Sequence, residues 1–170
     1  MRLAIPSIGA ETTPGSLLGN HEAVMRQFIK VVINNGDYSA LNDLVHPDYV
    51  YRAPGQEMRG AEDIQTLFET YRSAFSDLKI LINDLIATDD RVAIAFTLTG
   101  THDGALMGIE ATGKRVKVNG TVFSRFEGGK IIEEWEILDQ LSLIEQLGVA
   151  CLPARDHHAE PYHSCHRIHR

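Results

Sequence analysis

The chain has little cysteine, a deficit of basic residues and no long apolar run. Only two of its 170 residues are cysteines, Cys151 and Cys165, and both lie beyond the last predicted helix. No disulfide framework therefore holds the body of the protein, and a reducing cytoplasm is the expected location. Acidic residues outnumber basic ones by 23 to 16. This balance argues against a nucleic-acid partner, because phosphate binding requires a basic face.

The length and composition suit one globular domain with a separate segment at each end. No run approaches the ~20 apolar residues that a membrane span requires, so we expect no membrane contact. Residues 1–19 have one arginine and no long apolar core, which indicates a flexible leader instead of a signal peptide. Residues 20–149 are expected to form the domain, since this length can bury a substantial core.

Residues 150–170 form a tail rich in histidine and cysteine. Five of the eight histidines lie there: His157, His158, His163, His166 and His169. Such a cluster can bind zinc or nickel, but its spacings match no closed structural zinc site. We expect this tail to be disordered, and we predict no metal site and no cofactor.

Helical periodicity in the first half gives way to strand periodicity in the second half. Loop 103–113, with an apolar tip at 106–109, separates the long strands. Helices first and consecutive strands later are typical of an α+β fold with an antiparallel sheet. Three helices are expected at 21–34 with Asn20 as the N-cap, from Asp37 to His46, and at 61–75, followed by a fourth at 140–147 between Asp139 and Gly148. Strands are expected at 49–52, 78–87, 91–102, 114–126 and 130–138.

The last predicted strand carries three carboxylates, Glu133, Glu134 and Glu136, in an otherwise apolar run. A three-residue loop at 127–129 fits a type I turn with a glycine bulge. In that register Phe126 faces Lys130, and directly opposed residues share a face. One face then holds Val118, Gly120, Val122, Ser124, Ile132, Glu134, Glu136 and Leu138, and the other holds Thr121, Phe123, Arg125, Ile131, Glu133, Trp135 and Ile137. A two-residue loop would change the partners.

Both faces of this hairpin are largely apolar, so we expect one to pack on the helices and the other to be a candidate subunit interface. On the helix side, Glu134 and Glu136 would lie about 6.5–7 Å apart in a partly apolar cavity. Burial and mutual repulsion would raise at least one pKa toward neutrality, as general acid–base catalysis requires. Alternatively, both carboxylates reach solvent or pair with Arg52 or Arg125.

Several segments in order along residues 20–149 resemble the SnoaL-like polyketide cyclases, a family also labelled ester cyclases. The segments are His46-Pro47-Asp48-Tyr49, Gly100-Thr101-His102, Thr112-Gly113-Lys114, Arg125 to Ile131, Glu133-Glu134-Trp135, Asp139-Gln140-Leu141 and Gln146-Leu147-Gly148. The resemblance implies a nuclear-transport-factor-like cone, also called a cystatin-like roll. In such a cone a curved antiparallel sheet covers about three helices and a deep pocket. It also implies a homodimer through the outer sheet face.

The resemblance also implies a chemistry. In characterised cyclases of the family, an acidic residue on the last strand is the general acid and base of an intramolecular aldol closure without metal, cofactor or covalent intermediate. The matching residue is Glu136, where those cyclases carry aspartate. Their polar residue on the adjoining strand falls at Val122, and Tyr51 falls near another polar pocket position. Fold-mates include isomerases, dehydratases, epoxide hydrolases and binding proteins.

The leading hypothesis is therefore a cofactor-independent cyclase or isomerase that acts on a hydrophobic carbonyl compound of polyketide or ester type. Glu136 would exchange protons, Glu134 would tune its pKa, and Tyr51 and His102 would stabilise or relay charge. Two alternatives remain: a non-catalytic module for binding or dimerisation, and a hydrolase or dehydratase in which Glu136 activates water.

Other residues are candidate substrate contacts, and for some of them a purely structural role is also open. Val122, Ser124 and Leu138 share the face of the two glutamates. Met107 could form a lid or cover the sheet edge. His46 could contact the pocket mouth or only bond nearby backbone, and His102 could be a proton shuttle or a wall residue.

Overall fold

Helices lead and consecutive strands follow in the computed structural model, which describes residues 14–150 and 166–167. The helical elements are α1 (Pro14–Gln27), the π-helix η1 (Phe28–Asn34), the 3-10 helix η2 (Tyr38–Ala40), α2 (Leu41–Leu44), α3 (Gly60–Ala74) and α4 (Gln140–Leu147). The strands are β1 (Val45–Ala53), β2 (Gln56–Arg59), β3 (Lys79–Ala87), β4 (Arg91–Thr101), β5 (Arg115–Glu127), β6 (Lys130–Leu138), β7 (Val149–Ala150) and β8 (His166–Arg167). None of the described helices is long and apolar enough to cross a membrane. The α+β prediction is confirmed.

Six strands form one sheet in the order β2-β1-β6-β5-β4-β3. It is mostly antiparallel, as predicted, and β1 and β6 are its parallel pair. Strand β2 was not predicted; it folds back on β1 over the turn at Pro54-Gly55, where Gly55 has a positive φ of 77°. The parallel pair places two strands that are distant in sequence next to each other at the centre of the site.

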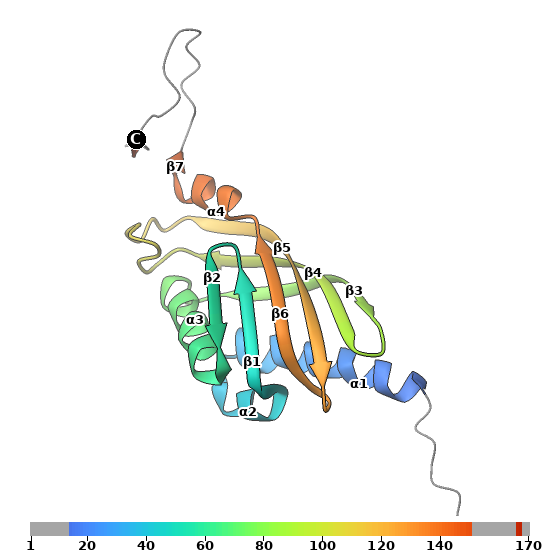
Figure 1. The fold of residues 1–170 in the computed structure, drawn as a ribbon. Coiled ribbons are helices and arrows are strands. Elements are labelled where there is room, and N and C mark those ends of the chain that lie inside the picture. Colours follow the sequence, from blue (N-terminus) through green and yellow to red (C-terminus); the bar gives the residue numbers. More distant parts are fainter. Residues whose placement is uncertain (1–13, 151–165, 168–170) are drawn as a thin grey trace, which may run out of the picture.

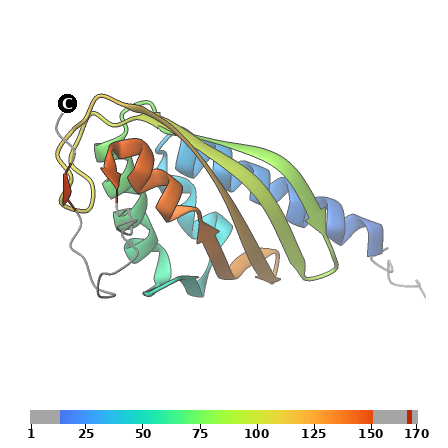
Figure 2. The ribbon, with the colours of Figure 1, turned by 90° about the horizontal axis from the view of Figure 1, so that it is seen from above.

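The sheet arches over α1 and η1 and is covered on that face by helices, with α3 beside β1 and β2 (Figures 1 and 2). The buried side of the continuous helix α1–η1 consists of apolar residues at helical spacing: Met25, Phe28, Ile29, Val32 and Ile33. They pack against inward residues of β4 and β5, which alternate with outward residues as a period of two requires. The core therefore lies between the helices and the concave face of the sheet.

Most predicted boundaries agree with the structure to within a residue or two, with two clear exceptions. Strand β1 begins at Val45, four residues before the predicted strand at 49–52, and the helix predicted from Asp37 to His46 ends at Leu44. Helix α1 begins at Pro14 and not at His21, so Asn20 lies inside the helix and is not its N-cap. Proline suits a first helical turn, where its missing N–H has no intrahelical partner. Asp139 caps α4 by accepting the N–H of Ser142 at 3.0 Å, and Gly148 ends that helix with a φ of 89°.

The hairpin between β5 and β6 turns in two residues and not in the predicted three. Gly128 and Gly129 both have positive φ, 58° and 79°, as a type I′ turn requires. Glu127 therefore pairs with Lys130, which corrects the predicted pairing of Phe126 with Lys130.

A bulge in β6 then restores the predicted facing. The pairing jumps from Phe126–Ile131 to Arg125–Glu133, which leaves Ile132 as an extra residue. The two-residue turn and the bulge together shift the pairing by two residues from the predicted register, so Glu134 lies opposite Ser124 and not opposite Val122. A shift of two preserves the alternation, so the residues after Ile132 keep their predicted faces. Ile131 does not: it lies opposite Phe126 and is fully buried, whereas the prediction placed it on the outer face.

Gly120 on β5 lies against the ring of Phe96 on β4. The two residues pair across the strands, and a Cβ at Gly120 would overlap that ring. The absent side chain gives Phe96 its place on the inner face of the sheet, where the ring forms part of a cavity wall.

Candidate active site

Strand β6 presents two of its three carboxylates to the helices. Glu134 pairs with Ser124 and Glu136 pairs with Val122, and both glutamates contribute to the wall of an internal cavity. Glu133 points to the opposite face, as the sequence analysis expects. The three acidic residues therefore lie in two different environments.

Glu134 is buried and held by two hydroxyl groups. The Tyr49 hydroxyl donates to Oε2 at 2.5 Å, and the Ser124 hydroxyl donates to Oε1 at 2.8 Å. Burial raises the pKa of Glu134, and the two hydrogen bonds partly offset this because they favour the charged form. Each carboxylate oxygen thus has a fixed donor.

Glu136 lies two residues further along β6 and lines both compartments of the cavity. Burial, followed by the negative charge of Glu134, raises its pKa from 4.5 to about 7, and an interaction with the Tyr51 hydroxyl acts in the opposite direction. A carboxyl group with a pKa near 7 can both accept and return a proton at neutral pH. Glu136 therefore has the protonation behaviour of a general acid–base residue.

The cavity has two adjoining compartments that meet at Glu136 and Tyr51. Their shared wall consists of Ile33, Tyr51, Phe68, Ile80, Phe96 and Glu136. The space open to the centre of a water molecule is about 20 Å³ in one compartment and about 30 Å³ in the other. This volume holds about one or two water molecules in each compartment. A larger ligand therefore requires side chains in the wall to move.

Two tyrosines supply further hydroxyl groups to this wall. Tyr51 on β1 lines both compartments, and Tyr71 on α3 lines one of them together with Glu136. Burial and then the charge of Glu136 raise the pKa of Tyr71 to about 12, and the same causes raise the pKa of Tyr51. Both phenols therefore stay protonated at neutral pH and can donate hydrogen bonds to a bound oxygen atom.

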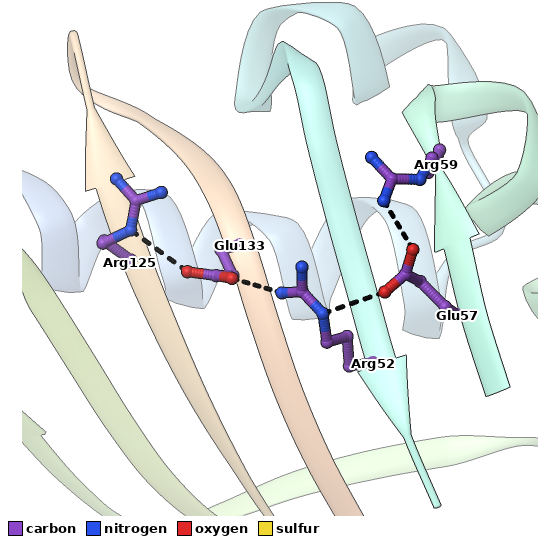
Figure 3. A network of polar contacts seen from close by, with 5 residues as sticks. All are labelled: Arg52, Glu57, Arg59, Arg125 and Glu133. Atoms are coloured by element: carbon purple, nitrogen blue, oxygen red, sulfur yellow. Dashed lines mark hydrogen bonds and ion pairs between the residues drawn. The ribbon is translucent and has the colours of Figure 1, made fainter. Parts of the chain in front are cut away.

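Glu133 belongs to an ion-pair network on the outer face of the sheet (Figure 3). It accepts from Arg125 at 3.2 Å and from Arg52, which also donates to Glu57 at 3.1 Å. Burial raises the pKa of Glu133, but the hydrogen bonds from the two arginines outweigh this and lower it. The arginine pairing that the sequence offered as an alternative for Glu134 and Glu136 is thus made by Glu133.

Three predicted substrate contacts share the inner face with the glutamates. Val122 lines the cavity opposite Glu136, and Leu138 lines its second compartment. Ser124 is buried and contacts Glu134, not the free space of the cavity. It therefore acts on the site through a carboxylate.

His102 lies apart from the cavity wall. Its ring is fully buried 5.4 Å from the ring of Phe75, centroid to centroid, and Nδ1 accepts the backbone N–H of Thr112 at 3.2 Å. Burial lowers the pKa of His102, and the charge of Asp103 acts in the opposite direction. The structure does not bring His102 to the two glutamates, and we leave it out of the mechanism proposed below.

Met107 and His46 also lie away from the cavity. Met107 forms the tip of a tight turn with Gly108 and is 57% exposed. His46 follows α2, and its Nδ1 accepts the backbone N–H of Asp48 at 3.1 Å. The structure therefore shows local contacts for both residues and brings neither to the two glutamates.

Sequence reasoning missed Tyr49 and Tyr71 as site residues. The predicted helix at 61–75 contains Tyr71 and the predicted strand at 49–52 contains Tyr49, but neither pattern places the residue at the site. The signal for Tyr49 was its position two residues before Tyr51, since alternate strand residues share a face. Recognising it required the pairing of β1 with β6.

Within residues 14–150 and 166–167, no cluster of three or more histidine, cysteine or acidic side chains could hold a metal ion. The histidine- and cysteine-rich cluster of the tail lies mostly outside the described residues. The polar groups that line the cavity are the carboxyl groups of Glu134 and Glu136 and the hydroxyl groups of Tyr51 and Tyr71.

Comparison with known proteins identifies a family whose sequence pattern this chain matches. The family whose sequence model matches is described as SnoaL-like polyketide cyclase, and the match covers residues 23–147. No curated protein sequence matches the chain.

Solved structures show the same fold. AclR from Streptomyces galilaeus, a proposed hydroxylase, is 31% identical with a TM-score of 0.70, over 80% of this chain and 99% of that chain. IdmH from Streptomyces antibioticus, a proposed polyketide cyclase, is 26% identical with a TM-score of 0.68, over 76% of this chain and 99% of that chain. A proposed SnoaL-like polyketide cyclase from Jannaschia sp. CCS1 is 18% identical with a TM-score of 0.73, over 82% and 97% of the two chains, and supports the fold alone.

Proposed function

Since this chain belongs to the SnoaL-like polyketide cyclase family, we propose that it catalyses a cyclase- or isomerase-type reaction with Glu136 as general acid and base. The observation that carries the proposal is the position of Glu136: it lies in the cavity wall with a pKa near 7, next to a second carboxyl group. The names of similar proteins include both a hydroxylase and a cyclase, so the reaction type is argued from the site.

In the proposed reaction, the Glu136 carboxylate removes a proton from a carbon next to a carbonyl group. The electron pair left on that carbon then attacks a second carbonyl carbon of the same molecule and forms the ring bond. The oxygen of the second carbonyl takes the proton back from Glu136, so the enzyme ends in its starting state. The step needs no cofactor, because both the proton and the electron pair remain within the substrate and Glu136.

Hydroxyl groups that line the same cavity support this reaction. The hydroxyls of Tyr51 and Tyr71 are donors in the compartment that Glu136 lines, and an enolate oxygen would gain from them in a site with little water. The rest of the wall is apolar and aromatic, which suits a hydrophobic carbonyl compound of polyketide or ester type. Such a compound exceeds the free volume of the cavity, so we propose that it binds with displacement of wall side chains such as Phe68.

The test is a glutamine substitution at Glu136. Aromatic polyketides, β-keto esters and lactones are first screened for thermal stabilisation of the protein, and turnover of each hit is then measured. We expect Glu136→Gln to lose turnover by at least two orders of magnitude, while Glu133→Gln, an acid on the same strand but the outer face, retains it. Full turnover by Glu136→Gln would remove this residue from the mechanism.

A second candidate function is water activation by Glu136, as in a hydrolase or dehydratase. The free space beside Glu136 has the size of a water molecule, which favours this alternative. Turnover in ¹⁸O-labelled water distinguishes a hydrolase from a cyclase: a hydrolase transfers the label from the solvent to its product, whereas an aldol closure forms its carbon–carbon bond without it. A dehydratase takes up no label either, and its product is lighter than the substrate by one water molecule.

We also propose a homodimer through the outer face of the sheet. Five large apolar side chains are more than half exposed there: Leu81, Ile86, Phe123, Trp135 and Ile137. A large exposed apolar patch on a folded protein usually marks a site of interaction with another molecule. The measurement that tests it is the molecular mass in solution.

A further inference from the structure

The two carboxyl groups of the site are not held alike. Glu134 accepts a hydrogen bond on each oxygen, from Tyr49 and from Ser124. Glu136 has no such pair of fixed donors among the described residues; it lines the cavity and interacts with Tyr51. One carboxyl group is therefore locked in place, and the other faces the space where a ligand would bind.

The lock depends on the parallel pairing of β1 with β6. Tyr51 lies opposite Glu134 in that register, and Tyr49, two residues earlier, points to the same face of the sheet. Tyr49 is fully buried and its hydroxyl reaches Oε2 of Glu134. Burial, followed by the charge of Glu134, raises the pKa of Tyr49, so its hydroxyl remains a donor at neutral pH.

A hydroxyl donor stabilises the charged form of a carboxyl group. Two neighbouring carboxyl groups in an apolar site resist double ionisation, so the better-stabilised one carries the charge and the other keeps the proton longer. Because Glu134 has two hydroxyl donors, it is the carboxyl group of the pair that ionises first.

We propose that Tyr49 is a positioning residue that keeps Glu134 ionised and thereby leaves the exchangeable proton of the pair on Glu136. This inference deepens the proposed function and rests on it, because it explains why Glu136 and not Glu134 is the group that exchanges protons with the substrate. Tyr49 acts through Glu134 and has no contact with the ligand in this scheme.

The groups that surround Glu134 and Glu136 are hydroxyl-bearing or apolar. From β1 these are Tyr49 and Tyr51, from α3 Tyr71, and from β5 the neutral Ser124. The residues that α1, η1, β3 and β4 contribute to the cavity wall are apolar: Met25, Phe28, Ile29, Ile33, Ile80, Ile94, Phe96 and Leu98. The protonation of the pair is therefore set by the two carboxyl groups and their hydroxyl neighbours.

The experiment is a carboxyl ¹³C NMR titration of protein labelled at glutamate, between pH 4.5 and 9. The signals are assigned with Glu134→Gln and Glu136→Gln. In the unaltered protein we expect the Glu136 signal to titrate near pH 7, after Glu134. In Tyr49→Phe we expect the Glu134 midpoint to rise by roughly one pH unit and the Glu136 midpoint to fall, because a hydrogen bond to a charged group has about that effect.

Tyr38→Phe is the matched control. The Tyr38 hydroxyl is also buried but has no hydrogen-bond partner in the described part of the chain, so its removal should leave both midpoints unchanged. Ser124→Ala removes the other donor and should shift the midpoints in the same direction as Tyr49→Phe; it decides the question if Tyr49→Phe does not fold. Unchanged midpoints in a folded donor variant would overturn the inference. Full turnover by Glu136→Gln would instead overturn the proposed function and leave the titration result intact.

Discussion

Replacing Glu136 with glutamine should stabilise this protein at high pH and leave its stability nearly unchanged at low pH. In the unfolded chain the Glu136 carboxyl group ionises near its usual pKa of 4.5, and in the folded protein near 7. Below pH 4.5 the group is neutral in both states. As the pH rises toward 7, the unfolded state releases its proton more readily than the folded state, so the free energy of unfolding falls.

The size of this loss follows from the two pKa values. At about 1.4 kcal/mol per pH unit, the change from 4.5 to about 7 corresponds to roughly 3 kcal/mol above pH 7. Glutamine has nearly the same shape and no charge at any pH, so the variant does not suffer the loss. A loss of this size is a large fraction of the stability of a typical domain.

Urea unfolding of the two proteins at several pH values between 4.5 and 8.5 measures the effect. The difference in unfolding free energy should grow from near zero at pH 4.5 to about 3 kcal/mol in favour of the variant at pH 8.5. Glu133→Gln should behave in the opposite way: it removes a carboxylate whose pKa is lowered in the folded state, so the variant is the less stable one at neutral pH and the difference shrinks in acid. A Glu136→Gln variant that is destabilised at pH 8.5, or equally stabilised at every pH, would show that this carboxyl group does not titrate as argued.

Three further predictions concern other parts of the fold. Gly120→Ala should lower the free energy of unfolding by about 1–3 kcal/mol, because the new methyl group overlaps the Phe96 ring; urea unfolding would contradict this if the variant matched the parent protein. Trp135→Lys should shift the molecular mass from dimer to monomer, since it places a charge in the proposed interface; sedimentation equilibrium tests it, and a monomeric parent protein would refute the dimer itself. Asp139→Ala should cost about 1 kcal/mol by removing the cap on the Ser142 N–H, with thermal unfolding as the measurement and an unchanged melting temperature as the contrary result.

The sequence predicts the fold class and the elements well, because their apolar spacing is strongly periodic. It predicts five strands of the main sheet, all but β2, and the α4 caps for local reasons: alternation, an aspartate before the helix and a glycine after it. It does not predict that α1 begins at Pro14, since residues 14–20 have no apolar stripe that marks a helix.

The site is predicted in part. Contacts between residues close in sequence could be inferred, and contacts between residues distant in sequence could not. The inward direction of Glu134 and Glu136 depends on their own hairpin and could be inferred. The Tyr49 contact depends on β1 lying beside β6, a pairing between residues 85 positions apart, and no local pattern indicates it. The placements of His102 and Met107 depend in the same way on how a loop packs, which a single sequence does not show.

The bulge at Ile132 sets which side chains of β6 face the helices. The residues after it face the sides they do because the bulge adds one residue to β6. If the pairing continued regularly from the two-residue turn without a bulge, Glu133 would lie opposite Ser124 on the inner face and Glu134 opposite Phe123 on the outer face, without any change of a side chain in the site. Deletion of Ile132 itself would only remove the bulge, because Glu133 would then follow Ile131 and keep its place opposite Arg125. The same logic allows compensation: a three-residue turn without the bulge would restore the original facing. In this hairpin, the pairing register between the turn and Glu134 matters as much as the identity of Glu134 itself.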